Sequence, residues 1–130
     1  MVMAMIPRYR AYDGGSLCRM YSPEEVMVGN GDIWIIDEDG VAGEWIVNND
    51  LVLMQSTGLT DKNDKEIFEG DVVKMAKNVY SEPTYYEVVR HRGGAYRLES
   101  KQHGCELWLR HTDCEIAGNI WENPELLEVE

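Results

Sequence analysis

The sequence has few of the features that mark membrane, secreted or metal-binding proteins. No apolar run approaches the length of about 18 residues that a membrane-spanning helix needs. The opening segment 1–6 lacks the basic flank of a secretory leader. Only three cysteines occur, at scattered positions, and an odd number without a framework pattern fits a reducing compartment. We therefore expect a cytoplasmic protein with no membrane partner.

Catalytic motifs are also missing. Gly58 and Gly70 are isolated and form no phosphate-binding loop, and the sequence has no Gly-x-Ser-x-Gly elbow and no His-Glu-x-x-His motif. Glu66, Glu69 and Asp71 lie close in sequence, but acid–base catalysis needs carboxyl groups on opposite sides of a substrate. A solvated acidic turn is the simpler interpretation. The sequence predicts neither an enzyme nor a cofactor.

Positive charge is scarce and unevenly placed. The chain has 24 acidic residues against 12 Lys and Arg, a net charge of −12. Positions 20–61 carry nine carboxylates and no Lys or Arg, whereas 86–111 carry five Lys and Arg against three Glu. A low isoelectric point is most simply a means of keeping a small protein soluble. An acidic field also repels phosphate backbones, so we expect nucleic acid to be a poor partner.

What the sequence does contain is a series of short β-branched and aromatic runs separated by turn residues, which predicts a mainly β fold. The expected strands are 33–36, 44–47, 51–54, 72–75, 85–91, 95–99, 106–110 and 115–121. The longest stretch between them is 55–70. Ser22 precedes a proline and two glutamates, and Asn123 precedes a proline, a glutamate and two leucines. Each sequence is typical of a helix start, so we expect one or two short helical turns. With 130 residues, we expect a single, small, partly open barrel-like domain over 1–130.

Period-2 alternation assigns the buried faces of these strands. Segments 85–91 and 95–99 predict a hairpin through Arg92, Gly93 and Gly94. Segments 33–36, 72–75 and 116–120 are expected in the core, and Gly70 and Gly118 are expected at bends or close approaches. The pairs expected to share a face are Tyr86 with Val88, Tyr96 with Leu98, Leu107 with Leu109, and Ile116 with Ile120.

Two groups of charged residues are the binding candidates. The acidic group is Asp37, Glu38 and Asp39, with Asp50 nearby in sequence. The basic group is Arg90, Arg92 and Arg97, around the hairpin tip, where arginines can clasp an acidic partner. For the basic group, an ordinary solvated hairpin end is the simpler interpretation.

A metal site and a stacking surface are weaker hypotheses. Four N and S ligands suit tetrahedral zinc, and His103, Cys105, His111 and Cys114 supply that set, but their spacing matches no standard zinc motif. Buried cysteines are more often core residues. The residues of a single-stranded nucleic-acid face on a small barrel would be Arg90, Arg92, Arg97, Lys101, Tyr96 and Trp108.

Three blocks of the sequence resemble the YopX family, small proteins encoded by bacteriophages and prophages. They are 6–13 (IPRYRAYD), 53–73 (LMQSTGLTDKNDKEIFEGDVV) and 116–127 (IAGNIWENPELL). The sequence departs at Asp64, where the family commonly has Gly, and Asp tolerates the left-handed turn conformation. The resemblance implies a β-rich, partly barrel-like fold, an intracellular phage setting, and an extension at 1–5. Within the second block, the segment 69–73 (EGDVV) is of a kind common in SH3-like barrels, which predicts SH3-like elements. It supplies no catalytic or binding residues.

Taken together, these observations predict a non-enzymatic phage or prophage accessory protein that binds a host or phage protein. The alternative is a single-stranded nucleic-acid-binding small β-barrel. Self-association is also expected, because a partly open barrel leaves a sheet edge that a second copy can cover, and the apolar segment 1–6 adds to such a contact.

Overall fold

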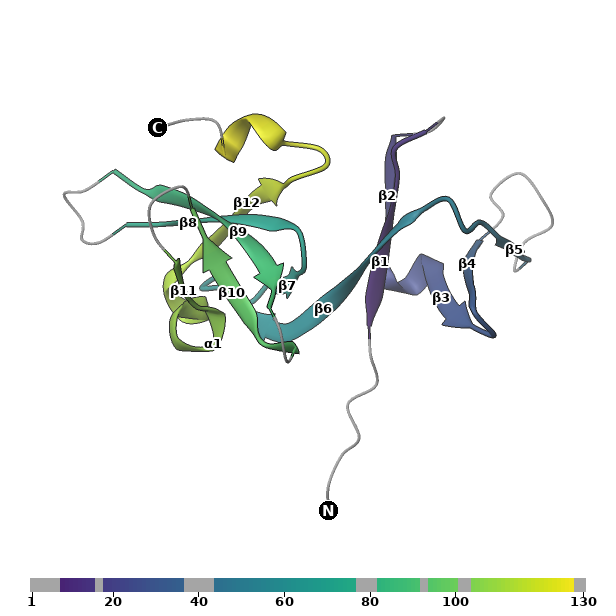
Figure 1. Cartoon of the computed structure of the whole chain (residues 1–130), viewed down its shortest axis with the longest axis horizontal. Coiled ribbons are helices and arrows are strands. Elements are labelled where there is room, and N and C mark those ends of the chain that lie inside the picture. The colour runs from purple at the N-terminus through teal and green to yellow at the C-terminus, as the bar shows by residue number, and fades with distance from the viewer. Residues whose placement is uncertain are drawn as a thin grey trace, which may run out of the picture. The chain divides into compact units, whose positions relative to one another are not determined.

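The computed structural model describes residues 8–15, 18–36, 44–76, 82–91, 94–100 and 104–127. Their backbone is mostly strand with a smaller share of helix, so the predicted mainly β fold is confirmed (Figure 1). The chain forms two compact units, Met1–Gln55 and Ser56–Glu130. Strand β6 (Val52–Thr60) crosses this boundary and pairs with β1 in the first unit and β7 in the second. The prediction of a single domain stays a prediction.

The first unit contains two groups of strands. They are β1 (Tyr9–Asp13), β2 (Arg19–Tyr21) and the first half of β6 in one sheet, and β3 (Val26–Gly29), β4 (Asp32–Ile36) and β5 (Trp45–Val47) in another. The buried core of this unit consists of Ala11, Tyr21, Val26, Ile35 and Leu51. Of the predicted core segment 33–36, Ile35 alone is fully buried, and the other three residues are half-buried. Trp34 and Ile36 point to the opposite face of the strand, and Ile33, on the same face as Ile35, packs against this core while half-buried.

A single 3-10 turn, η1 (Pro23–Glu25), leads from β2 into β3. The hydroxyl and the backbone N–H of Ser22 both donate to the last glutamate of this turn, at 3.0 Å, so the predicted cap is confirmed. The helix ends there, because Val26 already belongs to β3. Asn30 and Gly31, with φ of +54° and +79°, then form the two-residue turn that pairs β3 with β4. An Asn-Gly turn favours a hairpin rather than a continuing helix.

The second unit is built around a curled, half-barrel sheet. Its strands, in hydrogen-bonded order, are β11 (Gly104–Glu106), β10 (Tyr96–Glu99), β9 (Thr84–Arg90), β8 (Asp71–Met75) and β12 (Glu115–Asn119). The other elements are β7 (Glu66–Phe68), α1 (Leu107–Arg110), η3 (His111–Asp113) and η4 (Pro124–Leu127). Its core is formed by Ile67, Val73, Met75, Tyr86, Val88, Leu98, Leu107 and Cys114. Among the described residues, no helix is long and apolar enough to cross a membrane.

The predicted hairpin of 85–91 and 95–99 is confirmed as β9 and β10. Leu98 lies opposite Val88, and both side chains are fully buried, as the alternation of the two strands requires. Tyr86 is buried on the same face. Arg92 and Gly93, at the predicted tip, lie outside the described residues.

The predicted strand 106–110 is wrong. Glu106 ends β11, and the next four residues form the short helix α1. Leu107 is fully buried, whereas Leu109 is 57% exposed, so the two leucines do not share a face. The sequence Glu-Leu-Trp-Leu-Arg alternates as a strand does, but packing of Leu107 into the core fixes a turn at this point, and tertiary packing overrides local propensity.

Residues 55–70, the longest stretch between the expected strands, contain the second half of β6 and all of β7. Asp61 fixes the turn between them. Its side chain is buried, Oδ1 accepts the backbone N–H groups of Asn63 and Lys65, and Oδ2 accepts that of Ile116, each at 2.9 Å. This carboxylate therefore joins the turn to β12. Asp64, with φ of +65°, takes the left-handed conformation expected for it.

Gly70 and Gly118 occupy the expected constrained positions. Gly70 has φ of +86°, a conformation that L side chains rarely adopt. A Cβ on Gly118 would lie 2.4 Å from Oδ1 of Asn123, so this glycine allows a close approach. Next to Gly70, Asp71 is buried and its Oδ2 accepts the backbone N–H of Phe68 at 2.8 Å. The expected solvated acidic turn is therefore wrong for Asp71, because this carboxylate is buried and holds the turn through a backbone hydrogen bond.

Strand β12 departs from the predicted alternation. Its register with β8 shifts between Ile116 and Gly118, which is a β-bulge. The extra residue reverses the faces beyond it, so the prediction that Ile116 and Ile120 share a face is wrong. Asn119 is the buried residue at this end, and its Oδ1 accepts the backbone N–H groups of residues 121 and 122 at 3.0 and 2.8 Å.

Gly118→Ala is expected to lower the free energy of unfolding by about 2 kcal/mol, because the new methyl group overlaps the Asn123 side chain and overpacking of this kind costs about 1–3 kcal/mol. Gly29→Ala is the matched control, since a Cβ there meets nothing within 4 Å. Urea denaturation of both variants measures the difference. An equal effect of the two substitutions would contradict the close approach at Gly118.

Candidate interaction surface

The three-stranded sheet of the first unit has two distinct faces. Met27 lies opposite Trp34, which lies opposite Val47, so these three side chains form one row across β3, β4 and β5. Val26 and Ile35 belong to the other face, which packs into the core. The row therefore lies on the face that points away from the core. We call this face, with Ile36 and Trp45 as its further members, the outer face.

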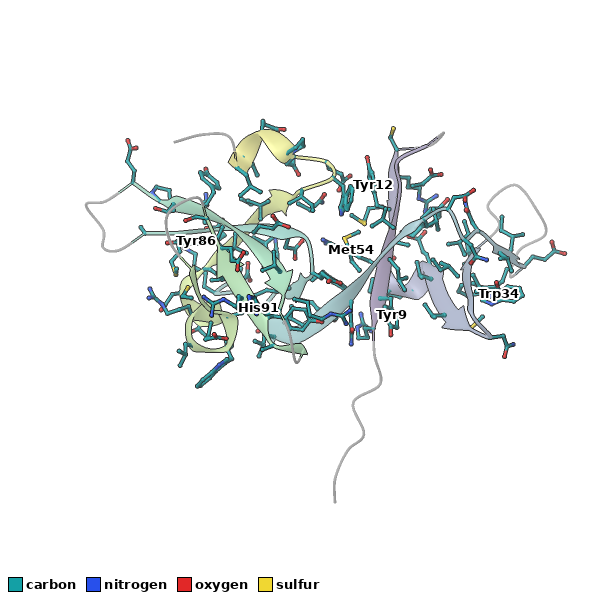
Figure 2. The ribbon with its side chains drawn as sticks, in the orientation of Figure 1. Tyr9, Tyr12, Trp34, Met54, Tyr86 and His91 are labelled. Atoms are coloured by element: carbon teal, nitrogen blue, oxygen red, sulfur yellow. The ribbon has the colours of Figure 1, made fainter. Side chains whose placement is uncertain are left out.

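The outer face is apolar and partly open to solvent. Met27 is 48% exposed and Val47 is 44% exposed, while Trp34 is half-buried. Figure 2 shows Trp34 on the side of β4 away from β1. Its indole N–H donates to the carbonyl of Gly29 at 3.3 Å, which fixes the ring at the surface. A contiguous exposed apolar surface that contains tryptophan is characteristic of protein-binding sites.

Carboxylates border this surface. Asp32 begins β4, Glu44 precedes β5 and Asp50 follows it, and positions 20–61 contain no Lys or Arg. The turn after β5 is well fixed, because Asn49 accepts the backbone N–H of Ile33 and donates to Asp32, both at 2.8 Å. The outer face thus combines apolar and aromatic side chains with negative charge at its border.

The acidic candidates predicted from the sequence are only partly described. Asp37, Glu38 and Asp39 lie outside the described residues. Asp50 is exposed, and its backbone N–H donates to Oδ1 of Asn48 at 3.0 Å. The binding role of these carboxylates stays a prediction.

The basic candidates belong to the second unit. Arg90 is exposed at the end of β9, and Arg92 lies outside the described residues. Arg97 is held by carboxylates of its own sheet: its Nη1 lies 2.5 Å from Glu106 and its Nε 3.8 Å from Glu99. An arginine already paired in this way is less available to a polyanion, and its binding role stays a prediction.

The aromatic residues of the hypothetical nucleic-acid face differ from one another. Tyr96 packs against the core of the second unit, whereas Trp108 on α1 is 63% exposed. Lys101 lies outside the described residues.

The four candidate zinc ligands have other surroundings. His103 lies outside the described residues, and no three His, Cys, Asp or Glu side chains elsewhere in the described ranges are grouped to hold a metal. Nδ1 of His111 lies 2.8 Å from the carbonyl of Thr60, and the thiol of Cys114 donates to the carbonyl of His111 at 3.2 Å. Burial, reinforced by the charge of Asp61, raises the pKa of Cys114 to about 11. A thiol that stays protonated is a poor nucleophile and metal ligand.

One carboxylate pair merits comparison with an acid–base site. Glu87 of β9 lies directly opposite Glu99 of β10. Burial, and then the charge of Glu99, raise the pKa of Glu87, and a raised pKa beside a second carboxylate is common in catalytic sites. The two side chains, however, stand side by side on neighbouring strands. Catalysis by two carboxyl groups needs them on opposite sides of a substrate.

Sequence reasoning missed the outer face. Its signal is the uninterrupted apolar run at 33–36, which gives β4 apolar side chains on both faces. Such a run usually indicates a strand buried on both sides. Only the structure shows that Met27 and Val47, on the face opposite Val26 and Ile35, are exposed.

Comparison with known proteins identifies a matching family and similar solved structures. The model of the YopX protein family matches residues 8–128 of the chain. Among solved structures, protein EF1440 from Enterococcus faecalis is 28% identical, with a TM-score of 0.65, over 95% of this chain and 99% of that one. Protein yopX from Bacillus subtilis is 18% identical, with a TM-score of 0.64, over 92% of this chain and 97% of that one. No curated protein matches the chain.

Proposed function

The chain belongs to the YopX protein family, and we propose that it is a non-enzymatic member that acts by binding another protein through the outer face of its first unit. The apolar row of Met27, Trp34 and Val47 is the observation that carries this proposal: Met27 and Val47 are exposed, Trp34 between them is half-buried, and carboxylates border the row. Aromatic side chains at the centre of a surface contribute most to binding, and a charged border sets the choice of partner. The partner is therefore a protein with an apolar patch bordered by Lys and Arg.

Two other classes of function receive less support. The net charge of −12 repels nucleic-acid backbones, and Arg97, the best placed arginine of the hypothetical binding face, is paired with Glu106. An enzyme would need a nucleophile or an opposed acid–base pair, and the sequence has no motif for either. We place the protein in the cytoplasm of a bacterial host, with a host or phage protein as partner, on the resemblance of its sequence to phage-encoded proteins.

Substituting the outer face tests the proposal. We expect the tagged native protein to capture a defined protein from bacterial lysate. The double variant Met27→Ser, Val47→Ser is expected to reduce the amount captured at least about tenfold, which is the effect of losing a binding hot spot. The matched control is Trp108→Ser with Leu109→Ser, which removes apolar side chains that are 63% and 57% exposed. This control should capture the same protein as the native chain. The opposite pattern would move the binding site to the second unit and contradict the proposal.

Removing negative charge should slow association. Replacing Asp37, Glu38 and Asp39 by Asn or Gln is expected to reduce the association rate constant with the captured partner and to flatten its salt dependence, because long-range attraction acts on the encounter. Stopped-flow or surface-plasmon measurements at two salt concentrations give both quantities. An unchanged rate constant would show that these carboxylates do not steer the partner.

A further inference from the structure

Strand β5 ends the three-stranded sheet. The strand order is β3, β4, β5, and in the part of the chain that the structure describes no strand pairs with the second side of β5. Backbone groups at such an edge are free to pair with another strand. The edge is flanked by apolar side chains on both faces, since Val47 lies on the outer face and Ile46, 42% exposed, on the other.

The register shows which backbone groups face outward. The backbone N–H of Asn48 donates to the carbonyl of Ile33 at 2.8 Å, so these two residues form a hydrogen-bonded pair. Hydrogen-bonded and non-bonded pairs alternate along antiparallel strands. Ile46 therefore directs its backbone groups to β4, and Trp45 and Val47 direct theirs away from the sheet. The same two residues place their side chains on the outer face.

Charge determines what can pair with this edge. Glu44 and Asp50 lie at the two ends of β5, and both are exposed. If β5 of a second copy paired antiparallel, Glu44 of each copy would approach the acidic end of the other, and facing like charges are unfavourable. A segment with Lys or Arg at both ends would instead meet opposite charges. The edge thus favours a basic partner over a second copy.

We propose that β5 binds its partner by strand addition: an extended segment with alternating apolar residues and Lys or Arg at its ends pairs with the outward backbone groups of Trp45 and Val47 and extends the outer face. This inference rests on the proposed function and specifies its mode. Backbone hydrogen bonds supply affinity in this mode, and alternate side chains supply specificity.

Synthetic peptides test the mode. The probe is fluorescein-labelled Lys-Lys-Val-Thr-Val-Thr-Val-Lys-Lys, followed by fluorescence anisotropy with the full chain. Three peptides are compared: this one, the same peptide with Glu in place of Lys, and the Lys peptide with alternate backbone nitrogens methylated. We expect the Glu peptide and the methylated peptide to bind at least about tenfold more weakly, because the first repels the carboxylates and the second cannot donate hydrogen bonds.

A protein variant tests the same contact from the other side. Val47→Pro removes an outward N–H but keeps the pairing of Ile46 with β4, and proline is tolerated at strand edges. Binding of the Lys peptide should fall at least about tenfold, while Leu109→Ser, in the second unit, leaves it unchanged. Far-ultraviolet circular dichroism checks that the Val47→Pro variant is folded. The methylated peptide tests the same contact with the native chain, so it does not depend on the folding of a variant.

The possible failures separate the two proposals. If the Lys and methylated peptides bind equally, or if neither the Lys nor the Glu peptide binds, strand addition is wrong. The proposed function would still stand if Met27→Ser with Val47→Ser abolished capture of a protein from lysate. If that pair of substitutions left capture unchanged, the proposed function itself would fall.

Discussion

Replacing Asp61 with alanine is expected to lower the free energy of unfolding by about 3 kcal/mol. The buried carboxylate accepts backbone N–H groups from Asn63, Lys65 and Ile116, and alanine leaves all three without their partner. These hydrogen bonds are partly buried, and each one lost to a charged acceptor costs about 1 kcal/mol or more. Asp50→Ala is the control, since Asp50 is exposed, and such a change stays within about 0.5 kcal/mol. Urea denaturation at neutral pH measures both.

The carboxylate of Asp61 also makes the stability of the folded protein depend on pH. Burial alone would raise its pKa, but the N–H groups of Ile116, Lys65 and Asn63 outweigh burial and hold the pKa of Asp61 below the ordinary value of 3.8. A lowered pKa contributes stability that is fully present above the ordinary value and is lost as the pH falls through the folded-state value. Asp61→Asn lacks this titration. The stability difference between native protein and Asp61→Asn should therefore shrink below a pH of about 4, and a constant difference would contradict the bonding described.

Leu107→Ala is expected to cost about 3 kcal/mol, because removing a fully buried leucine leaves a cavity in the core of the second unit. Leu109→Ala, two residues later in the same short helix, is the matched control. Its side chain is 57% exposed, so the expected change lies within about 0.5 kcal/mol. Thermal and urea denaturation of the two variants give the comparison.

The two variants together distinguish a helix from a strand at residues 107–110. In the strand predicted from the sequence, both leucines would face the core and both substitutions would be costly. Equal losses of stability would therefore contradict helix α1. A large loss for Leu107 alone would confirm it.

Local patterns predicted the fold well where they agreed with tertiary packing. The alternation in β9 and β10 placed Val88 and Leu98 correctly, since Glu87, Arg97 and Glu99 mark the opposite face of that hairpin as polar. Alternation failed at Leu109 and Ile120. At Leu109, the cause is the helical turn α1, which is anchored by the buried Leu107. At Ile120, the cause is the β-bulge beside Gly118, which packs against Asn123. Each changes which side chains point to the core. Both depend on contacts between segments distant in sequence, which a local pattern does not contain.

The candidate site was predicted only in its charge. The sequence located the acidic span 20–61, because counting charges needs no structure. It could not locate the outer face, because Trp34 and Ile35 are both apolar neighbours in one strand, and polarity does not reveal which of them is covered. Likewise, Arg97 looked available in sequence but is paired with Glu106 of the neighbouring strand.

Hydrogen–deuterium exchange of the chain with and without its captured partner tests the central claim most directly. If the partner binds the outer face and the edge of β5, backbone amides in 26–36 and 44–50 will exchange more slowly in the complex. Amides of β9, β10 and α1 will exchange at the rate of the free chain. Protection confined to β9, β10 and α1, with 26–36 and 44–50 unchanged, would contradict the claim that this protein binds its partner through the first unit.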